Sequence, residues 1–75
     1  MNTIDFALAG DHIALYHLLK LTGVSPSGGS AKVVIADGLV RVDGTVETRK
    51  ACKIRAGQTV ALDNATIHVT HAASA

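Results

Sequence analysis

Apolar residues in the first third of the chain follow two periods, one after the other. Residues 3–8 alternate between apolar and polar side chains, which predicts a half-buried strand. From residue 11 onward the spacing becomes helical, so we expect a first helix capped by Asp11 at its start and by Gly23 at its end. The inward positions are Ile4, Phe6 and Leu8 in the strand and Leu15, Leu18 and Leu19 in the helix.

A turn rich in serine and glycine leads into a second predicted helix, which ends at Gly38. Ser25 and Ser27 are both good N-cap residues, and the sequence does not decide between them. The buried stripe of this helix is expected at Ala31, Val34 and Ile35, with Lys32 on its flank.

Beyond the second helix the pattern alternates again. Asp43-Gly44 lies between two alternating runs and predicts a hairpin with a type I′ turn, because both central residues of that turn need a positive φ. A further strand is expected around Ile54 and a closing hairpin around Asp63-Asn64. In the first hairpin we expect Val40, Val42 and Val46 to point inward and Arg41 outward.

The elements add up to an α+β domain in which two short helices pack on a small, mainly antiparallel sheet. A chain of 75 residues has room for one such domain, which we place at residues 1–70, with residues 71–75 as a disordered tail. The aromatic residues are Phe6 and Tyr16, so the core must be aliphatic. This scarcity excludes a platform that reads single-stranded nucleic acid by stacking its bases on exposed rings.

Positive charge is concentrated in the middle of the chain. The formal net charge is +1, yet all seven Lys and Arg residues lie between Lys20 and Arg55. This segment contains seven basic and three acidic residues, which gives it a formal charge of +4. The segments before and after it have formal charges of −2 and −1. If the helices pack on the hairpin, much of this charge can share one surface. A local field of this kind attracts a partner that carries phosphate groups.

Patterns for catalysis or metal binding are weak. His12 and His17 lie five residues apart on the first helical pattern, and His68 and His71 point to opposite faces of a strand. Cys52 is the only cysteine, so the chain can form neither an internal disulfide nor a cysteine-based metal site. A reactive thiol remains an alternative, because the nearby Lys50 and Lys53 can lower the pKa of Cys52. We therefore expect no enzyme activity, no cofactor and no metal.

Residues 23–30 have the glycine spacing of a P-loop, but Gly29 stands where the essential lysine belongs. The element before this segment is also a predicted helix rather than a strand, which argues against nucleotide hydrolysis. Small residues at the start of a helix can still expose backbone N–H groups to an anion. The alternative is a simple capped turn.

Several segments together resemble the RNA-binding domain first recognised in a ribosomal small-subunit protein, the S-four-like or αL motif. The chain is most similar to the small stand-alone bacterial members of that family. The matching segments cover most of the chain from residue 13 to residue 60. They are Leu18-Leu19-Lys20-Leu21-x-Gly23, Gly28-Gly29-x-Ala31-Lys32, Gly38-x-Val40-x-Val42-Asp43-Gly44 and Glu47-Thr48-Arg49-Lys50.

This resemblance implies a non-catalytic domain that binds structured RNA, ribosomal or transfer RNA, with a role in ribosome assembly or translation. Gly28 stands where many family members carry arginine, which removes one expected phosphate contact. The contacts implied by position are Lys20, Ser27, Lys32, Arg41, Arg49, Lys50 and Lys53.

A second interpretation is a protein-interaction module that docks on a ribosome-associated factor, which the modest isoelectric point near 8.0 favours. The N-terminal residues lack the pattern of a secretion signal, and no apolar run approaches the roughly 20 residues needed to span a bilayer. We expect a soluble cytoplasmic monomer.

Overall fold

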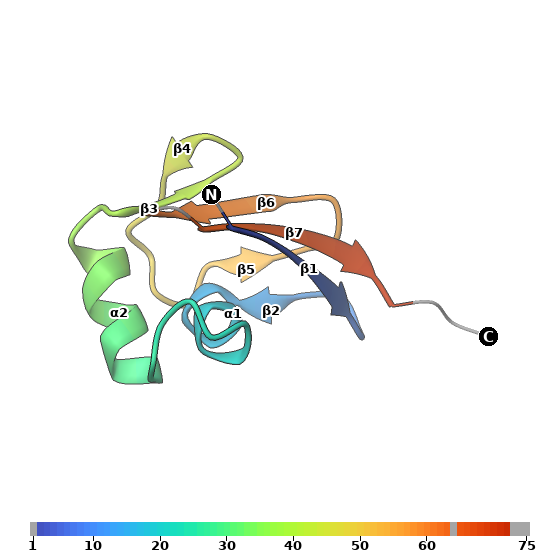
Figure 1. The fold of residues 1–75 in the computed structure, drawn as a ribbon, viewed down its shortest axis with the longest axis horizontal. Helices are drawn as coiled ribbons and strands as arrows, with labels where there is room; N and C mark the ends of the chain where they lie inside the picture. Colours follow the sequence, from blue (N-terminus) through green and yellow to red (C-terminus); the bar gives the residue numbers. More distant parts are fainter. Residues whose placement is uncertain (1, 64, 73–75) are drawn as a thin grey trace.

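The computed structural model of the chain describes residues 2–63 and 65–72. Within them the chain forms short strands and two helices, arranged as Figure 1 shows. The strands are β1 (Asn2–Leu8), β2 (Ile13–Ala14), β3 (Val40–Val42), β4 (Thr45–Val46), β5 (Lys53–Ile54), β6 (Thr59–Leu62) and β7 (Ala65–His71). The helices are α1 (Leu15–Leu21) and α2 (Gly28–Ala36).

Five strands form one sheet in the order β1-β7-β6-β3-β4, and β2 and β5 form a separate antiparallel pair. Strands β1 and β7 run parallel, while the other neighbours in the larger sheet are antiparallel. Both helices lie on one side of this sheet, below it in Figure 1. The predicted α+β fold, two short helices on a mainly antiparallel sheet, is confirmed.

The core between the sheet and the helices is aliphatic, as the composition requires. Phe6 and Tyr16 only pack against it and stay partly exposed. The buried residues are Leu8, Ile13, Leu15, Leu18, Leu19, Ala31, Ile35, Val40, Val42, Ile54, Val60, Leu62, Ile67 and Val69. Because both helices direct their apolar stripes at this core, their polar faces are left for solvent or a partner. Among the described residues, no helix is long and apolar enough to cross a membrane.

Helix α1 begins at Leu15, so the predicted cap at Asp11 is wrong. Ala14 occupies the N-cap position, and its side chain makes no capping hydrogen bond. The residues just before the helix are paired with β5, which holds them in an extended conformation. The predicted end is confirmed, because Gly23 follows the C-cap residue with a φ of +78°.

The start of α2 shows which serine is the cap. The N–H of Ser30 donates to Oγ of Ser27 at 3.1 Å, so Ser27 is the N-cap residue. Ser25 is instead buried, with 3% of its surface exposed. Gly38 has a φ of +77° just after the helix and ends it as predicted.

The turn between β3 and β4 is the predicted one. Asp43 and Gly44 both have positive φ, at 51° and 84°. The Asp43 carboxylate also accepts hydrogen bonds from the backbone N–H of Thr59, at 2.9 Å, and from the side-chain amide of Gln58, at 3.2 Å. The turn is therefore attached to the start of β6 and held in one position.

The sequence pattern places Val46 inside with Val40 and Val42, but the structure leaves Val46 45% exposed. A two-residue turn sets Val46 directly opposite Arg41. Residues opposite each other in an antiparallel pair point to the same face of a sheet. Because Arg41 is exposed, Val46 is exposed with it, so that part of the prediction is wrong.

Strands β6 and β7 form the predicted closing hairpin, with Leu62 opposite Ala65. His71 still belongs to β7, and the N–H of Ala72 donates to the carbonyl of Leu8 at 2.9 Å. The remainder of the expected tail, residues 73–75, lies outside the described residues.

Candidate nucleic-acid interface

Tyr16 in α1 is the point where three basic segments meet. The ammonium nitrogen of Lys32 lies 4.7 Å from the centroid of the Tyr16 ring, a cation–π contact between the two helices. A Cβ atom at Gly28 would be 3.8 Å from the same ring, so the first turn of α2 also lies against it. The N–H of Tyr16 donates to the carbonyl of Lys50 at 3.1 Å. Tyr16 thus connects α1 to α2 through its ring and to the β4–β5 segment through its backbone.

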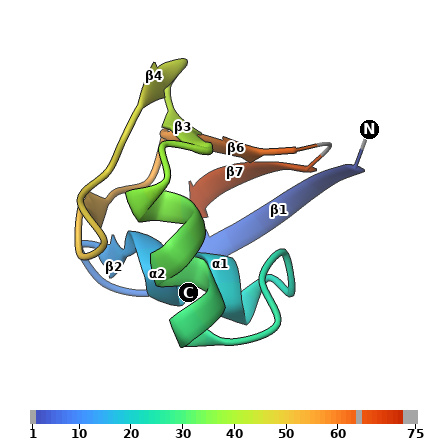
Figure 2. The same ribbon diagram turned by 90° about the vertical axis from the view of Figure 1, so that its left-hand side faces the viewer.

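The β4–β5 segment is attached to the start of α1 by its backbone. Besides the bond from Tyr16 to Lys50, the N–H of Leu15 donates to the carbonyl of Cys52 at 2.9 Å. These two carbonyls satisfy amides that a helix leaves unpaired at its start. Figure 2 shows the segment running beside α2 and β2. Its basic side chains are therefore presented from a fixed backbone rather than from a free loop.

Within this segment Glu47 and Arg49 form a two-pronged ion pair. Nε of Arg49 donates to Oε2 of Glu47 at 3.0 Å, and Nη2 donates to Oε1 at 3.1 Å. The backbone N–H of Arg49 donates to Oε2 as well, at 3.0 Å. These hydrogen bonds hold the pKa of the Glu47 carboxyl at about 2, below its ordinary value of 4.5. The pKa of Arg49 is raised in turn by its bonds to the carboxylate.

The lowered pKa of Glu47 predicts an acid-dependent contribution to stability. A carboxyl whose pKa is lower in the folded state contributes stability above its unfolded pKa and loses it as the pH falls through the folded value. We expect the urea midpoints of the wild type and Glu47→Gln to converge as the pH falls from 4.5 to 2. The urea midpoint of Arg49→Ala should converge with that of the wild type over the same pH range. A constant difference between wild type and Glu47→Gln across that range would contradict the bonded carboxylate.

Six of the seven predicted contacts lie on α1, on α2 or on the β4–β5 segment with β5, which are joined near the start of α1. Lys20 follows Tyr16 by four residues and so lies on the same face of α1. Ser27 begins α2, and Lys53 is paired with Ala14 immediately before α1. We call this surface the basic corner, and it consists of Lys20, Ser27, Lys32, Arg49, Lys50 and Lys53.

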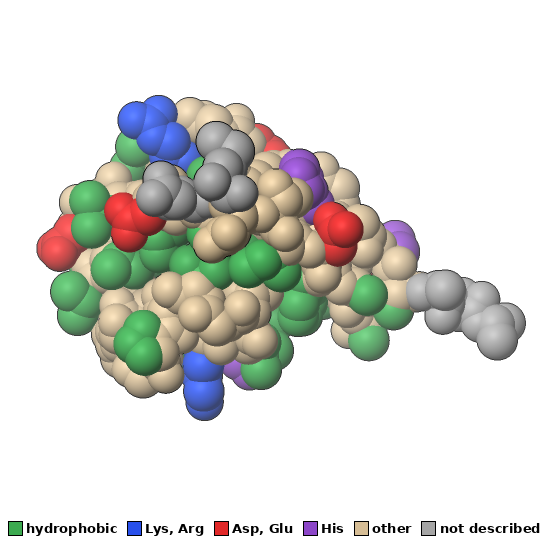
Figure 3. Space-filling model, viewed as in Figure 1, with side chains coloured by type: hydrophobic (Ala, Val, Ile, Leu, Met, Phe, Trp, Pro, Cys, Tyr) green, Lys and Arg blue, Asp and Glu red, His purple; other side chains and the backbone are tan. Residues whose placement is uncertain are grey.

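The seventh predicted contact, Arg41, lies elsewhere. Val40 and Val42 point into the core on the helix side of the sheet, so Arg41 between them points to the opposite face. Figure 3 shows Lys and Arg side chains at two separate margins of the molecule, one over the sheet and one under the helices. The expectation that the charge of the hairpin and the helices shares one surface is therefore wrong for Arg41.

Other candidate chemistry finds little support in the described residues. No group of three or more His, Cys, Asp or Glu residues there is placed to hold a metal ion. Burial raises the pKa of the Cys52 thiol, and nearby Glu47 raises it further, which opposes a reactive thiolate. Helix α1 precedes the glycine-rich turn, where a P-loop would need a strand.

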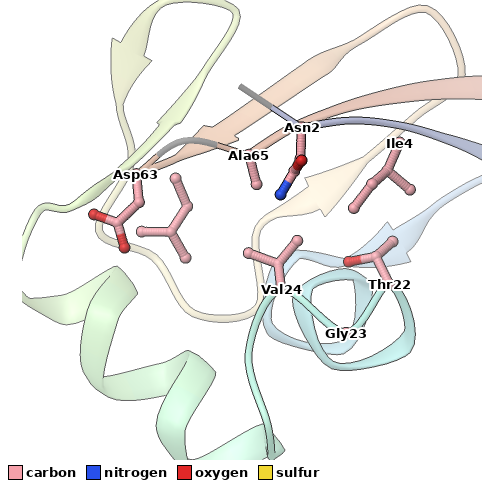
Figure 4. A pocket seen from close by; sticks show the side chains of 8 residues that line it. Asn2, Ile4, Thr22, Gly23, Val24, Asp63 and Ala65 are labelled. Atoms are coloured by element: carbon pink, nitrogen blue, oxygen red, sulfur yellow. The ribbon is translucent and has the colours of Figure 1, made fainter.

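A pocket of about 310 Å³ lies on another part of the molecule, between the start of β1, the end of β6 and the segment after α1 (Figure 4). The lining mixes the polar side chains of Asn2, Thr22 and Asp63 with apolar ones, and Figure 4 shows Val24 across the pocket from Asn2. The lining residues are Asn2, Ile4, Thr22, Gly23, Val24, Leu62, Asp63 and Ala65. None of the seven predicted contacts is among them, so this pocket is separate from the basic corner.

Sequence reasoning did not assign a role to Tyr16 or to Glu47. The contact between Tyr16 and Lys32 joins residues 16 positions apart on different helices, and no local pattern indicates it. Glu47 offered a weak signal, because it is an acid two residues before an arginine in a basic segment.

Comparison with known proteins gives consistent matches over most of the chain. The sequence model of the S4 domain family matches residues 6–70. YbcJ of Escherichia coli K12, named as an inferred RNA-binding protein, is 57% identical over 58 residues, which cover 77% of this chain and 83% of that protein. YbcJ of Shigella flexneri matches with the same values. The solution structure of Escherichia coli YbcJ, described as revealing an αL motif involved in RNA binding, matches with a TM-score of 0.72 and 51% identity. That match covers 93% of this chain and 90% of the other.

Proposed function

The chain belongs to the S4 domain family, and we propose that it is a non-catalytic module that binds structured RNA through the basic corner. The observation that carries this proposal is that three segments bearing basic residues, α1, α2 and β4–β5, are joined at Tyr16 by the Lys32 cation–π contact and by the backbone bond to Lys50. The description of the YbcJ structure as containing an αL motif involved in RNA binding supports it.

The mechanism follows from the chemistry of these residues. Lysine and arginine neutralise phosphates and release the counterions condensed on the RNA, which makes affinity depend steeply on salt. Lys32 already lies over one face of the Tyr16 ring, and the aromatic residues of the chain are only Phe6 and Tyr16, so there is no platform of rings on which bases could stack. Recognition therefore depends on the spacing of phosphates across a folded RNA rather than on the identity of its bases.

A folded RNA suits this surface better than a flexible strand. The backbone of the β4–β5 segment is bonded to α1, and Lys32 lies over Tyr16, so the segments that carry these charges have a fixed arrangement. A ribosomal or transfer RNA presents phosphates at fixed positions too. We accordingly propose a structured ribosomal or transfer RNA as the partner and ribosome assembly or translation as the setting, with the protein acting as a cytoplasmic monomer.

Competition between RNAs tests the proposal. The protein is bound to a labelled transfer RNA or ribosomal RNA hairpin, and unlabelled hairpin is compared with a homopolymer of equal length. We expect the hairpin to compete better, and with about four to six contacts the affinity should fall by roughly 50-fold to 2000-fold between 50 and 200 mM salt. Equal competition by the homopolymer would reduce the basic corner to a generic positive surface. No binding at low salt would overturn the proposed function.

A further inference from the structure

The Glu47 carboxylate is unusual because it is an acidic group that lies beside the basic corner and is partly covered by its neighbours. Its side chain is 17% exposed, whereas the side chain of Arg49 is 77% exposed. Besides its three bonds from Arg49, the carboxylate accepts a contact from Sγ of Cys52 at 3.5 Å. The backbone N–H of Glu47 is fixed as well, since it donates to the carbonyl of Val40 at 3.0 Å. Glu47 is therefore held both at its backbone and at its carboxylate, while the Arg49 side chain faces solvent.

We propose that Glu47 is a positioning residue for RNA binding, which holds the guanidinium of Arg49 in the orientation that meets a phosphate. The proposal rests on the proposed function and adds a role for an acidic residue beside the basic corner.

The geometry of the pair leaves part of the guanidinium free for such a contact. A guanidinium has five N–H donors in a rigid plane. Glu47 occupies the edge formed by Nε and Nη2, and Nη2 also approaches Sγ of Cys52 at 3.8 Å. Within the described residues Nη1 donates no hydrogen bond, and its two N–H groups lie on a side chain that is 77% exposed. A phosphate can bind there without displacing Glu47.

Two effects of Glu47 on RNA binding oppose each other. Its negative charge weakens the attraction of the basic corner for phosphate. Its hydrogen bonds remove rotamer freedom from Arg49 before the RNA arrives, so less freedom is lost on binding. If positioning outweighs repulsion, removing the charge of Glu47 lowers affinity even though the protein becomes more positive.

The test is a double-mutant cycle on binding to the structured RNA. Glu47→Gln, Arg49→Ala and the double variant are compared with the wild type by fluorescence anisotropy at fixed salt. We expect Glu47→Gln to weaken binding roughly threefold to tenfold, and to have no further effect once Arg49 is alanine. Glu47→Asp keeps the charge but shortens the side chain, so it should also weaken binding. This variant tests the proposal if Glu47→Gln does not fold. Asp37→Asn, which removes another acid outside the basic corner, is the matched control and should not weaken binding.

Tighter or unchanged binding by Glu47→Gln would overturn the inference while leaving the proposed function in place. A loss that persists in the Arg49→Ala background would also overturn it, because Glu47 would then act on the fold of the segment rather than through Arg49. No RNA binding by the wild type would overturn the proposed function, and the inference with it.

Discussion

Replacing Arg49 and Lys50 together by alanine is expected to weaken binding of structured RNA by about tenfold or more. Each removed phosphate contact also makes the dependence of log K on log salt less steep. Removing two contacts should reduce the magnitude of this slope by about 1.4 to 1.8. The size of the affinity loss follows from hydrogen bonds to charged groups, which are worth roughly 1.5–3 kcal/mol when desolvated and less at an exposed surface. Binding isotherms at several salt concentrations measure both quantities.

The fold should survive this change. The bond from Tyr16 to residue 50 uses the backbone carbonyl, which alanine keeps. An exposed ion pair such as Arg49–Glu47 contributes about 0–1 kcal/mol. The matched control is Arg41→Ala, which is compared with Lys50→Ala. Each variant removes one positive charge, but Arg41 lies on the face of the sheet opposite the helices, outside the basic corner. An unchanged salt slope in the double variant, or an equal loss with Arg41→Ala, would show that the basic corner is not the RNA site.

Replacing Leu18 by alanine is expected to cost about 2–5 kcal/mol of unfolding free energy. Leu18 is a residue of α1 that is completely buried in the core, so the change removes apolar contacts and leaves a cavity. A chain of 75 residues has a total stability of about 4–11 kcal/mol, so this loss is a large fraction of it. Urea denaturation should show a lower midpoint with an unchanged slope.

Leu21→Ala is the control for that prediction. Leu21 lies in the same helix but is 55% exposed, so its truncation should change stability by about 0.5 kcal/mol or less. Equal losses at the two positions would mean that α1 does not pack on the sheet through the stripe that contains Leu18.

Elements with a local signal could be predicted from the sequence. The alternation in β1, the glycines that end both helices and the Asp43-Gly44 turn each depend on neighbouring residues, and the structure has them as expected. The start of α1 could not be predicted, because its cap is the backbone of residues 50 and 52, far away along the chain. A side-chain acceptor such as Asp11 is the usual local signal, and here a non-local pairing replaces it.

The candidate site was predictable in composition but not in arrangement. The concentration of Lys and Arg between residues 20 and 55 indicated a phosphate-bearing partner. Which of them share a surface depends on the sheet face to which each strand residue points, and this separates Arg41 from the rest. The contacts of Tyr16 with Lys32 and of Glu47 with Arg49 exist only once the helices and the β4–β5 segment are in place.

The parallel pairing of β1 with β7 has a consequence for synthesis on the ribosome. Asn2 is paired with Ala65 and Leu8 with His71, so the first strand to emerge has its neighbour made last. At about 5–20 residues per second, translation of the intervening chain takes several seconds. During that time β1 exposes Phe6 and Leu8 without a partner strand, and the larger sheet can close only after translation has passed β7. The larger sheet is therefore completed only once β7 has been made, rather than progressively along the chain.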